Sequence, residues 1–343
     1  MANTNESAVM TSHNLLNYSG MLFNAGNTAT PFCTLIGGKS RTSNAWKFAT
    51  SIKYTTGGGT SQPAITESAS LTAPTREFVS RSQDTNVCQI FQRALSISYG
   101  KQSSMGQLSG INVAGQMANP ASELDFQVAN SMGAIQNDME YTFLNGSYQD
   151  GEYDDKAYKT RGITSAITTN AKALTGTPEL GYWNIAESIK SIAESHAPTD
   201  GLVLMAPFVN IMQLNADAAA NGLTIVNAAR EVNGIKIDTL VTPFGTIGLL
   251  PNPYVTSGTA LIVNPNVCAP VFMPVPGKGN FFLEPLSKTG AADDYQIYGQ
   301  AGLDYGAEWY HAKITGLKTT FTAPEYSKKV YVSGGQITTK ASS

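Results

Sequence analysis

Residues 119–146 read NPASELDFQVANSMGAIQNDMEYTFLNG, a stretch in which apolar side chains recur at three- and four-residue spacing. The members of this apolar stripe are Leu124, Val128, Met132, Ile135, Met139 and Phe143. The spacing predicts one long amphipathic helix over about residues 120–145, with Pro120 in its first turn and Gly146 at its end. The two methionines of the stripe are more typical of core packing than of a cofactor site.

Two stretches that precede this helix alternate apolar and polar residues, as β-strands do. Residues 46–54 read WKFATSIKY and residues 91–99 read FQRALSISY. The segment between them has no strong period and contains Gly57, Gly58, Gly59, Pro63 and Pro74. A structureless connection of about thirty residues is unusual inside a compact domain, and a two-stranded arm cannot bury its apolar face alone in water. We therefore predict that residues 46–99 form an extended two-stranded loop that lies on a neighbouring subunit.

Beyond residue 180 the sequence alternates between helical and strand patterns. Residues 185–193 and 209–222 have the apolar period of helices, and residues 201–207 between them read as a buried strand. Short strands are predicted in GIKIDTLVT, GTIGLLP and TALIVNP, so that residues 180–276 form a compact α/β unit. The alternation from Tyr295 to Trp309 predicts a last long strand, which returns to the sheet beside the long helix.

Composition narrows the possible functions. The chain has 343 residues, of which 14% are charged, and its net charge is −3. Soluble domains average roughly 25% charged residues, and a subunit covered by copies of itself needs less surface charge than a free monomer. No cluster of lysines and arginines is present, which argues against a protein that binds the phosphate backbone of a nucleic acid. Three separated cysteines, no secretory signal and no apolar run of membrane-spanning length predict a soluble protein made in cytoplasm.

Sequence motifs for chemistry are weak. Residues 33–40, CTLIGGKS, end like a phosphate-binding loop, but Cys33 stands where that loop needs its first glycine. We interpret this stretch as a glycine-containing connection. Residues 150–162, DGEYDDKAYKTRG, lack the spacing of a calcium loop and are interpreted as a solvated acidic turn. The histidines have no partner at metal-ligand spacing, so we expect no catalytic residue, cofactor or metal.

The charges are unevenly distributed along the chain. Residues 1–120 carry eight Lys/Arg against four Asp/Glu, whereas residues 121–160 carry two against eight. One interpretation is that both are solvated faces that never meet, because exposed ion pairs contribute little. The other is charge complementarity between neighbouring subunits.

Several stretches resemble the major capsid proteins of tailed bacteriophages, the HK97-like family. They are TPFCTLIGGKSRTSNAWKF (30–48), NVCQIFQRALSISY (86–99), ELDFQVANSMGAIQNDMEYTFLNG (123–146) and TRGI (160–163). The resemblance implies an α+β HK97-like major capsid fold with an N-terminal arm, an extended two-stranded loop, a long spine helix, a peripheral domain and an α/β axial domain. The implied boundaries are 1–45 for the arm, 46–99 for the loop, 100–179 for the peripheral domain with the spine helix, 180–276 for the axial domain, and 277–343 for the return to the peripheral domain and the C-terminal segment.

The resemblance also implies a function. Copies of the chain would assemble through hexamers and pentamers into an icosahedral shell that encloses double-stranded DNA without sequence-specific binding. Expected partners are a separate scaffolding protein, because only about 45 residues precede the loop, together with a portal and decoration proteins, and no membrane. The shell would be assembled in the host bacterial cytoplasm and become the virion capsid. The alternatives are an encapsulin-type shell, which would enclose protein cargo instead of a genome, and a hydrolase whose catalytic residues are distant in sequence.

The proposed inter-subunit contacts follow from the resemblance and the charge pattern. The basic loop of one copy would meet the acidic helix of the next. The candidate contact residues are Trp46, Lys47, Lys53, Gly58, Pro63, Arg76, Arg81, Glu123, Asp125, Asp138 and Glu140.

Overall fold

The structure is a computed structural model, and it describes the chain in segments. The described residues are 29–54, 62–74, 78–100, 123–152, 155–221, 225–232, 235–288, 290–322, 332–333 and 336–337. The chain divides into two compact units, one of residues 1–168 and 265–308 and the other of residues 169–264 and 309–343. We call them unit 1 and unit 2 and describe each by itself.

A mixed sheet organises unit 1, and its longest strand is β13 (Ala292–Asp304). One edge of β13 pairs antiparallel with β4 (Gln89–Ser98) along ten residue pairs. The other edge pairs first with β12 (Phe281–Pro285) and then with β11 (Ala269–Phe272), which also pairs with the short β1 (Arg41–Thr42). The last strand predicted from the sequence therefore does return to the sheet. It ends at Asp304 rather than Trp309, because Gly306 turns the chain at φ 65° and a 3₁₀ turn, Glu308–Tyr310, follows.

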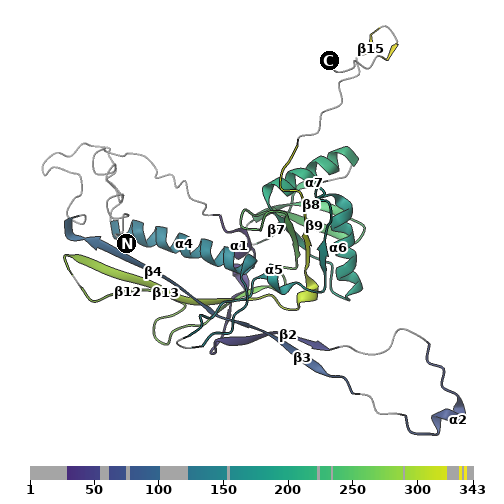
Figure 1. The fold of residues 1–343 in the computed structure, drawn as a ribbon, viewed down its shortest axis with the longest axis horizontal. Coiled ribbons are helices and arrows are strands. Elements are labelled where there is room, and N and C mark those ends of the chain that lie inside the picture. Colours follow the sequence, from purple (N-terminus) through teal and green to yellow (C-terminus); the bar gives the residue numbers. More distant parts are fainter. Residues whose placement is uncertain are drawn as a thin grey trace. The chain divides into compact units, whose positions relative to one another are not determined.

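The long helix α4 (Glu123–Asn145) packs against β4 and β13, as Figure 1 shows. Within its apolar stripe, Ile135 and Phe143 are fully buried. The helix ends at Asn145, directly before Gly146, as the sequence predicts. Only glycine fits at position 146, because a Cβ there would lie 2.5 Å from the carbonyl oxygen of Thr142. Gly146 accepts a backbone hydrogen bond from Gly162 at 2.9 Å, and α5 (Ile163–Ala166) begins there.

The extended loop pairs differently from the sequence prediction. Strand β2 (Lys47–Tyr54) pairs antiparallel with β3 (Arg81–Val87), and the two leave the sheet as a separate ribbon (Figure 1). The prediction that residues 91–99 form the second strand of the loop is wrong, since that stretch is β4 and pairs with β13. Strand β3 was missed because its sequence, RSQDTNV, has no apolar alternation. The short helix α2 (Glu67–Ser70) lies in the connection between β2 and β3.

Unit 2 is an α/β unit with one mixed sheet in its described part. The strand order is β5-β14-β10-β6-β9-β8-β7. The strands are β5 (Ala171–Ala173), β6 (Val203–Ala206), β7 (Ile225–Val232), β8 (Ile235–Thr242), β9 (Gly245–Pro251), β10 (Thr259–Val263) and β14 (Ala312–Thr315). Helices α6 (Tyr182–Glu194) and α7 (Phe208–Asn221) pack on it, with Ile185, Ile189 and Leu214 in the core. A separate small pair, β15 (Val332–Ser333) and β16 (Gln336–Ile337), lies near the C-terminus.

The helices and strands predicted between residues 180 and 263 are present, with small shifts of their ends. Residues 265–276, which the sequence placed in the α/β unit, belong by their contacts to unit 1, because β11 pairs with β13. The division into arm, loop, peripheral and axial domains stays a prediction. Among the described residues, no helix combines the length and apolar character needed to cross a bilayer.

Candidate functional site

The connection between β2 and β3, which we call the loop tip (residues 55–80), exposes large apolar side chains. Leu71 is 86% exposed, Phe78 is 91% exposed and Ile65 is 74% exposed. The tip has local order of its own, because the Thr66 hydroxyl accepts a hydrogen bond from the Ala69 backbone N–H at 3.2 Å and caps α2. A monomer gains nothing from holding such side chains in water, so the loop tip is a surface that another molecule can cover.

The base of the β2–β3 ribbon is anchored by Asn86, which is fully buried. Its amide nitrogen donates to the carbonyl oxygens of Arg161 at 3.0 Å and Leu303 at 2.7 Å. Its amide oxygen accepts from the backbone N–H groups of Val87 at 2.9 Å and Arg161 at 2.7 Å. One side chain therefore joins the ribbon, the turn after α4 and the end of β13.

A second polar cluster lies beside Asn86. The Tyr305 hydroxyl donates to Asp84 at 2.7 Å, and the Arg161 guanidinium donates to Asp84 at 3.0 Å and to the Tyr305 oxygen at 3.1 Å. Burial and the neighbouring Asp84 carboxylate raise the pKa of the Tyr305 hydroxyl, so it keeps its proton and its donor role. Arg161 also lies over the Tyr148 ring at 4.6 Å. No local pattern in the sequence predicts this cluster, because its members come from four distant stretches that only the fold brings together.

Three predicted contact residues at the ribbon have partners within their own chain. Trp46 stacks on Tyr158 with ring centroids 4.7 Å apart. Lys47 pairs with Asp150 at 2.7 Å, and Lys53 lies 3.9 Å from Glu308. These contacts hold the ribbon on unit 1. The Lys47 pair is half exposed, and water screens it, so it is weak enough to exchange for another partner.

The predicted acidic residues fall into different environments. Asp138 is exposed on α4 and pairs with Arg93 of β4 at 2.5 Å. Glu140 is fully buried, and its carboxylate accepts hydrogen bonds from the backbone N–H groups of Phe32 at 2.8 Å and Cys33 at 2.7 Å. Glu140 therefore fastens α1 (Pro31–Ile36) to α4 inside its own subunit.

The other predicted contact residues lie in the loop tip, at the start of β3, in the first turn of α4 or outside the described residues. Arg81 and Pro63 are exposed, at the start of β3 and in the loop tip. Glu123 and Asp125 belong to the first turn of α4, but their side chains lie outside the description. Gly58 and Arg76 lie outside the described residues. The inter-subunit role of all eleven predicted residues stays a prediction.

The Gly-Lys-Ser stretch is a connection, as predicted from the sequence. Helix α1 and a 3₁₀ turn, Gly37–Lys39, precede Ser40 instead of following it. The Lys39 ammonium donates to the Pro265 carbonyl oxygen at 3.2 Å and to Asn266 at 3.1 Å. A phosphate-binding loop needs its lysine free and a helix after it. In the described part of the chain, His, Cys, Asp and Glu side chains form no cluster of three or more that could hold a metal ion.

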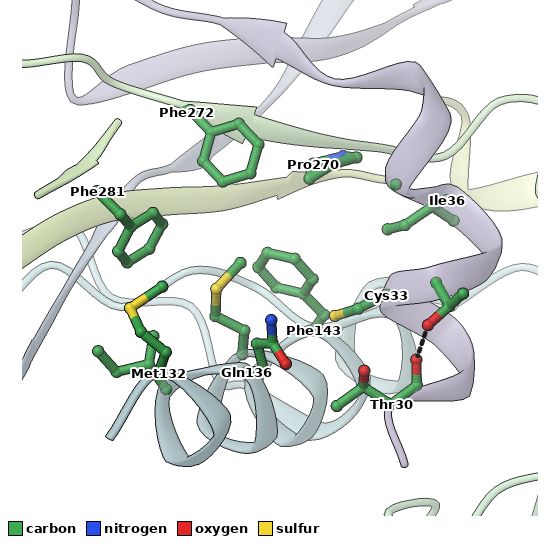
Figure 2. Close-up of a pocket in the computed structure, with 13 residues that line it drawn as sticks. Thr30, Cys33, Ile36, Met132, Gln136, Phe143, Pro270, Phe272 and Phe281 are labelled. Carbon is green, nitrogen blue, oxygen red and sulfur yellow. Dashed lines mark hydrogen bonds between the residues drawn. The ribbon is translucent and has the colours of Figure 1, made fainter. Parts of the chain in front are cut away.

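An apolar groove of about 360 Å³ runs between α1, α4 and the sheet of unit 1, and Figure 2 shows it. Met132, Met139 and Phe143 line it from α4, and Phe272 and Phe281 line it from β11 and β12. The two methionines were predicted to pack in the core; they are half-buried and line the groove instead. The groove offers apolar surface and few polar groups, which suits a side-chain guest rather than a reaction.

We expect that Glu140→Ala will loosen α1 from α4. The substitution removes the acceptor of two buried hydrogen bonds and leaves the N–H groups of Phe32 and Cys33 without it, at a cost of about 2–4 kcal/mol. Urea unfolding of the unassembled subunit would measure the loss. Asp138→Ala, on an exposed part of the same helix, serves as the control and should cost no more than about 1 kcal/mol. Equal effects of the two substitutions would contradict the role given to Glu140.

An anchored ribbon with an exposed apolar tip is typical of proteins that assemble with copies of themselves. The chain matches the family model described as SU10 major capsid protein over residues 3–318, and it belongs to that family. Its role is that of a major capsid protein of a tailed-phage shell. A comparison with curated proteins found no match.

Solved structures of other shell proteins have the same HK97-like α+β fold. The holo-SrpI encapsulin complex from Synechococcus elongatus is similar with a TM-score of 0.59 at 10% identity, over 92% of this chain and 98% of that one. The capsid of cyanophage A-1(L) has a TM-score of 0.59 at 10% identity, over 90% and 99%. The capsid of Ralstonia phage GP4 has a TM-score of 0.56 at 12% identity, over 90% and 95%. At such identities the likeness establishes the fold, and the family model carries the assignment to a phage capsid.

Proposed function

We propose that the chain assembles through hexamers and pentamers into an icosahedral shell around a double-stranded DNA genome, with the loop tip of each copy laid on its neighbour. The exposure of Ile65, Leu71 and Phe78 carries the second part of this proposal. Fully burying an aliphatic or aromatic side chain contributes roughly 1.5–3 kcal/mol, so three such residues per copy supply a large driving force for assembly.

The hydrogen-bonded base of the ribbon supports the same proposal, because it fixes the position of the ribbon on unit 1. The hydrogen bonds of Asn86 and the cluster of Asp84, Arg161 and Tyr305 fix the direction in which β2 and β3 leave unit 1. A fixed direction lowers the conformational entropy that is lost when the loop tip binds a neighbour. The anchored ribbon is thus preorganised for a repeated, identical contact.

The net charge of the chain supports a wall that encloses DNA rather than one that binds it tightly. The net charge of −3 and the absence of a Lys/Arg cluster in the sequence favour a wall that does not bind the packed genome tightly. We propose that a separate scaffolding protein and a portal direct assembly in the host cytoplasm, and that decoration proteins bind the finished virion shell.

Electron microscopy of the sedimented protein, with and without its scaffolding protein, tests the proposed function. Closed icosahedral shells that contain DNA after infection are the expected result. Shells that contain a copurifying protein instead of a genome would favour the encapsulin-type alternative. A subunit that stays monomeric under all conditions would contradict the proposal and leave the exposed loop tip without a purpose.

We expect Arg81→Glu to weaken assembly, and more strongly at low salt than at high salt. Arg81 is exposed at the start of β3, and we propose that it faces acidic residues of the neighbour such as Glu123 or Asp125. Exposed pairs contribute about 0.2–1 kcal/mol each, so reversal should raise the critical assembly concentration a few-fold. Light scattering against protein concentration at two ionic strengths would measure this.

A charge swap sharpens that experiment. Arg81→Glu combined with Glu123→Lys and Asp125→Lys should recover part of the lost assembly if these residues meet across the interface. Unchanged assembly of the single variant, or no recovery in the combined variant, would count against this pairing while leaving the apolar contact of the loop tip untouched.

A further inference from the structure

The groove of unit 1 is lined mostly by apolar side chains and is partly open to solvent. Its volume of about 360 Å³ is more than twice that of a 150 Å³ cavity that binds benzene, so it has room for more than one large side chain. Ile36, Ile135 and Phe143 line it and are fully buried. Thr30, Thr34 and Gln136 are the polar residues that line it. Figure 2 shows Thr30, Cys33 and Ile36 along the α1 side. The half-buried rings and thioethers of the lining would lose further contact with water if a guest entered.

We propose that the guest is the apolar segment Met21-Leu22-Phe23 of the same chain. The groove begins where the described chain begins, since Thr30 is one of its lining residues. Only residues 24–29, NAGNTA, separate this segment from Thr30. Six residues can span about 20 Å, and their small and polar side chains place little constraint on the path.

Chain connectivity favours this guest over one from another molecule. A short tether gives its segment an effective concentration in the millimolar range, well above the concentration of free subunits in a dilute preparation. Met, Leu and Phe also match a lining of methionine, isoleucine and phenylalanine. The proposal does not depend on shell assembly, because both halves of the contact belong to one subunit.

The cysteines supply a probe. Cys33 lines the groove and is half-buried, whereas Cys88 and Cys268 are fully buried. Cys88 and Cys268 have no exposed surface, so a reagent does not reach either thiol in the folded subunit. Burial also raises the pKa of the Cys88 thiol to about 12 and that of the Cys268 thiol well above its ordinary value. Burial and the adjacent Glu140 also raise the pKa of Cys33, which slows its reaction in every variant alike. Reaction of the native subunit with a disulfide reagent therefore reports on Cys33, and a Cys33→Ser variant confirms the assignment.

The first experiment compares the reaction rate of Cys33 in the dilute full chain and in the triple variant Met21→Ser, Leu22→Ser, Phe23→Ser. If the docked state is about 90% populated, its loss should speed the reaction about tenfold. Leu15→Ser with Leu16→Ser is the matched control and should leave the rate unchanged. Equal rates in the full chain and the triple variant would overturn the proposal, as would an equal acceleration in the control.

A second measurement gives a positive signal. Under mild oxidation, Asn24→Cys, which keeps the docking segment intact, should form an intrachain disulfide with Cys33 at least about tenfold faster than Asn5→Cys does, because docking raises the local concentration of the thiol. Disulfide-linked dimers whose yield rises with protein concentration, in place of the intrachain product, would assign the groove to a second copy. That result would overturn the same-chain proposal.

Discussion

Deletion of residues 57–74 is expected to abolish closed shells while leaving a folded subunit. Tyr54 and Arg81 are register partners at the open end of the ribbon, so the remaining residues 55–56 and 75–80 are enough to reconnect β2 to β3. The deletion removes Ile65 and Leu71, which contribute nothing to the core of the free subunit. Sedimentation and electron microscopy would score assembly, and circular dichroism would score folding.

Point substitutions separate the apolar contact from the length of the loop. Ile65→Ser, Leu71→Ser and Phe78→Ser together remove an apolar contribution of up to about 9 kcal/mol per copy. A loss of only about 2 kcal/mol per contact would already raise the critical assembly concentration roughly thirtyfold. The matched control is the polar triple Gln62→Ala, Ser68→Ala and Thr72→Ala in the same loop tip. Normal shells from the apolar triple would refute the proposal that the loop tip covers a neighbour.

The second large effect is expected at Asn86. Asn86→Ala leaves two carbonyl oxygens and two N–H groups without the partners they have in the folded subunit. Each buried polar group that loses its partner costs about 1–3 kcal/mol, and water that enters the vacated space recovers part of this. We expect unit 1 to lose about 3–5 kcal/mol and the ribbon base to open.

Hydrogen exchange of the unassembled subunit would locate that loss. Amides of β3 and the start of β4 should lose protection in Asn86→Ala, whereas those of β6 and β10 in unit 2 should keep theirs. Gln83→Ala, exposed on the same strand as Asn86, is the control and should change stability by less than about 0.5 kcal/mol. Unchanged protection of β3 in Asn86→Ala would show that the ribbon does not depend on this side chain.

Much of the fold follows from periodic patterns in the sequence. The stripe from Leu124 to Phe143 predicts α4, and the alternation that begins at Tyr295 predicts most of β13. The helical and strand periods between residues 180 and 263 predict α6, α7 and most strands of unit 2. These predictions work because each element buries one regular face, and a regular face leaves a repeat that can be read in the sequence.

Pairing and polar anchoring were decided by the tertiary structure. Strand β3 is polar, so no apolar repeat marks it, and its side chains at Asp84 and Asn86 are satisfied by Arg161, Leu303 and Tyr305. Glu140 has the sequence character of a surface acid on α4, yet it is buried because α1 presents two backbone N–H groups to it. By itself the sequence determined the periodic elements and the presence of a long connection between residues 54 and 91 that has no strong period of its own. Only the tertiary structure decided which strands pair and which polar groups are buried. Both depend on contacts between residues that are far apart in the chain, and a local sequence pattern does not predict such contacts.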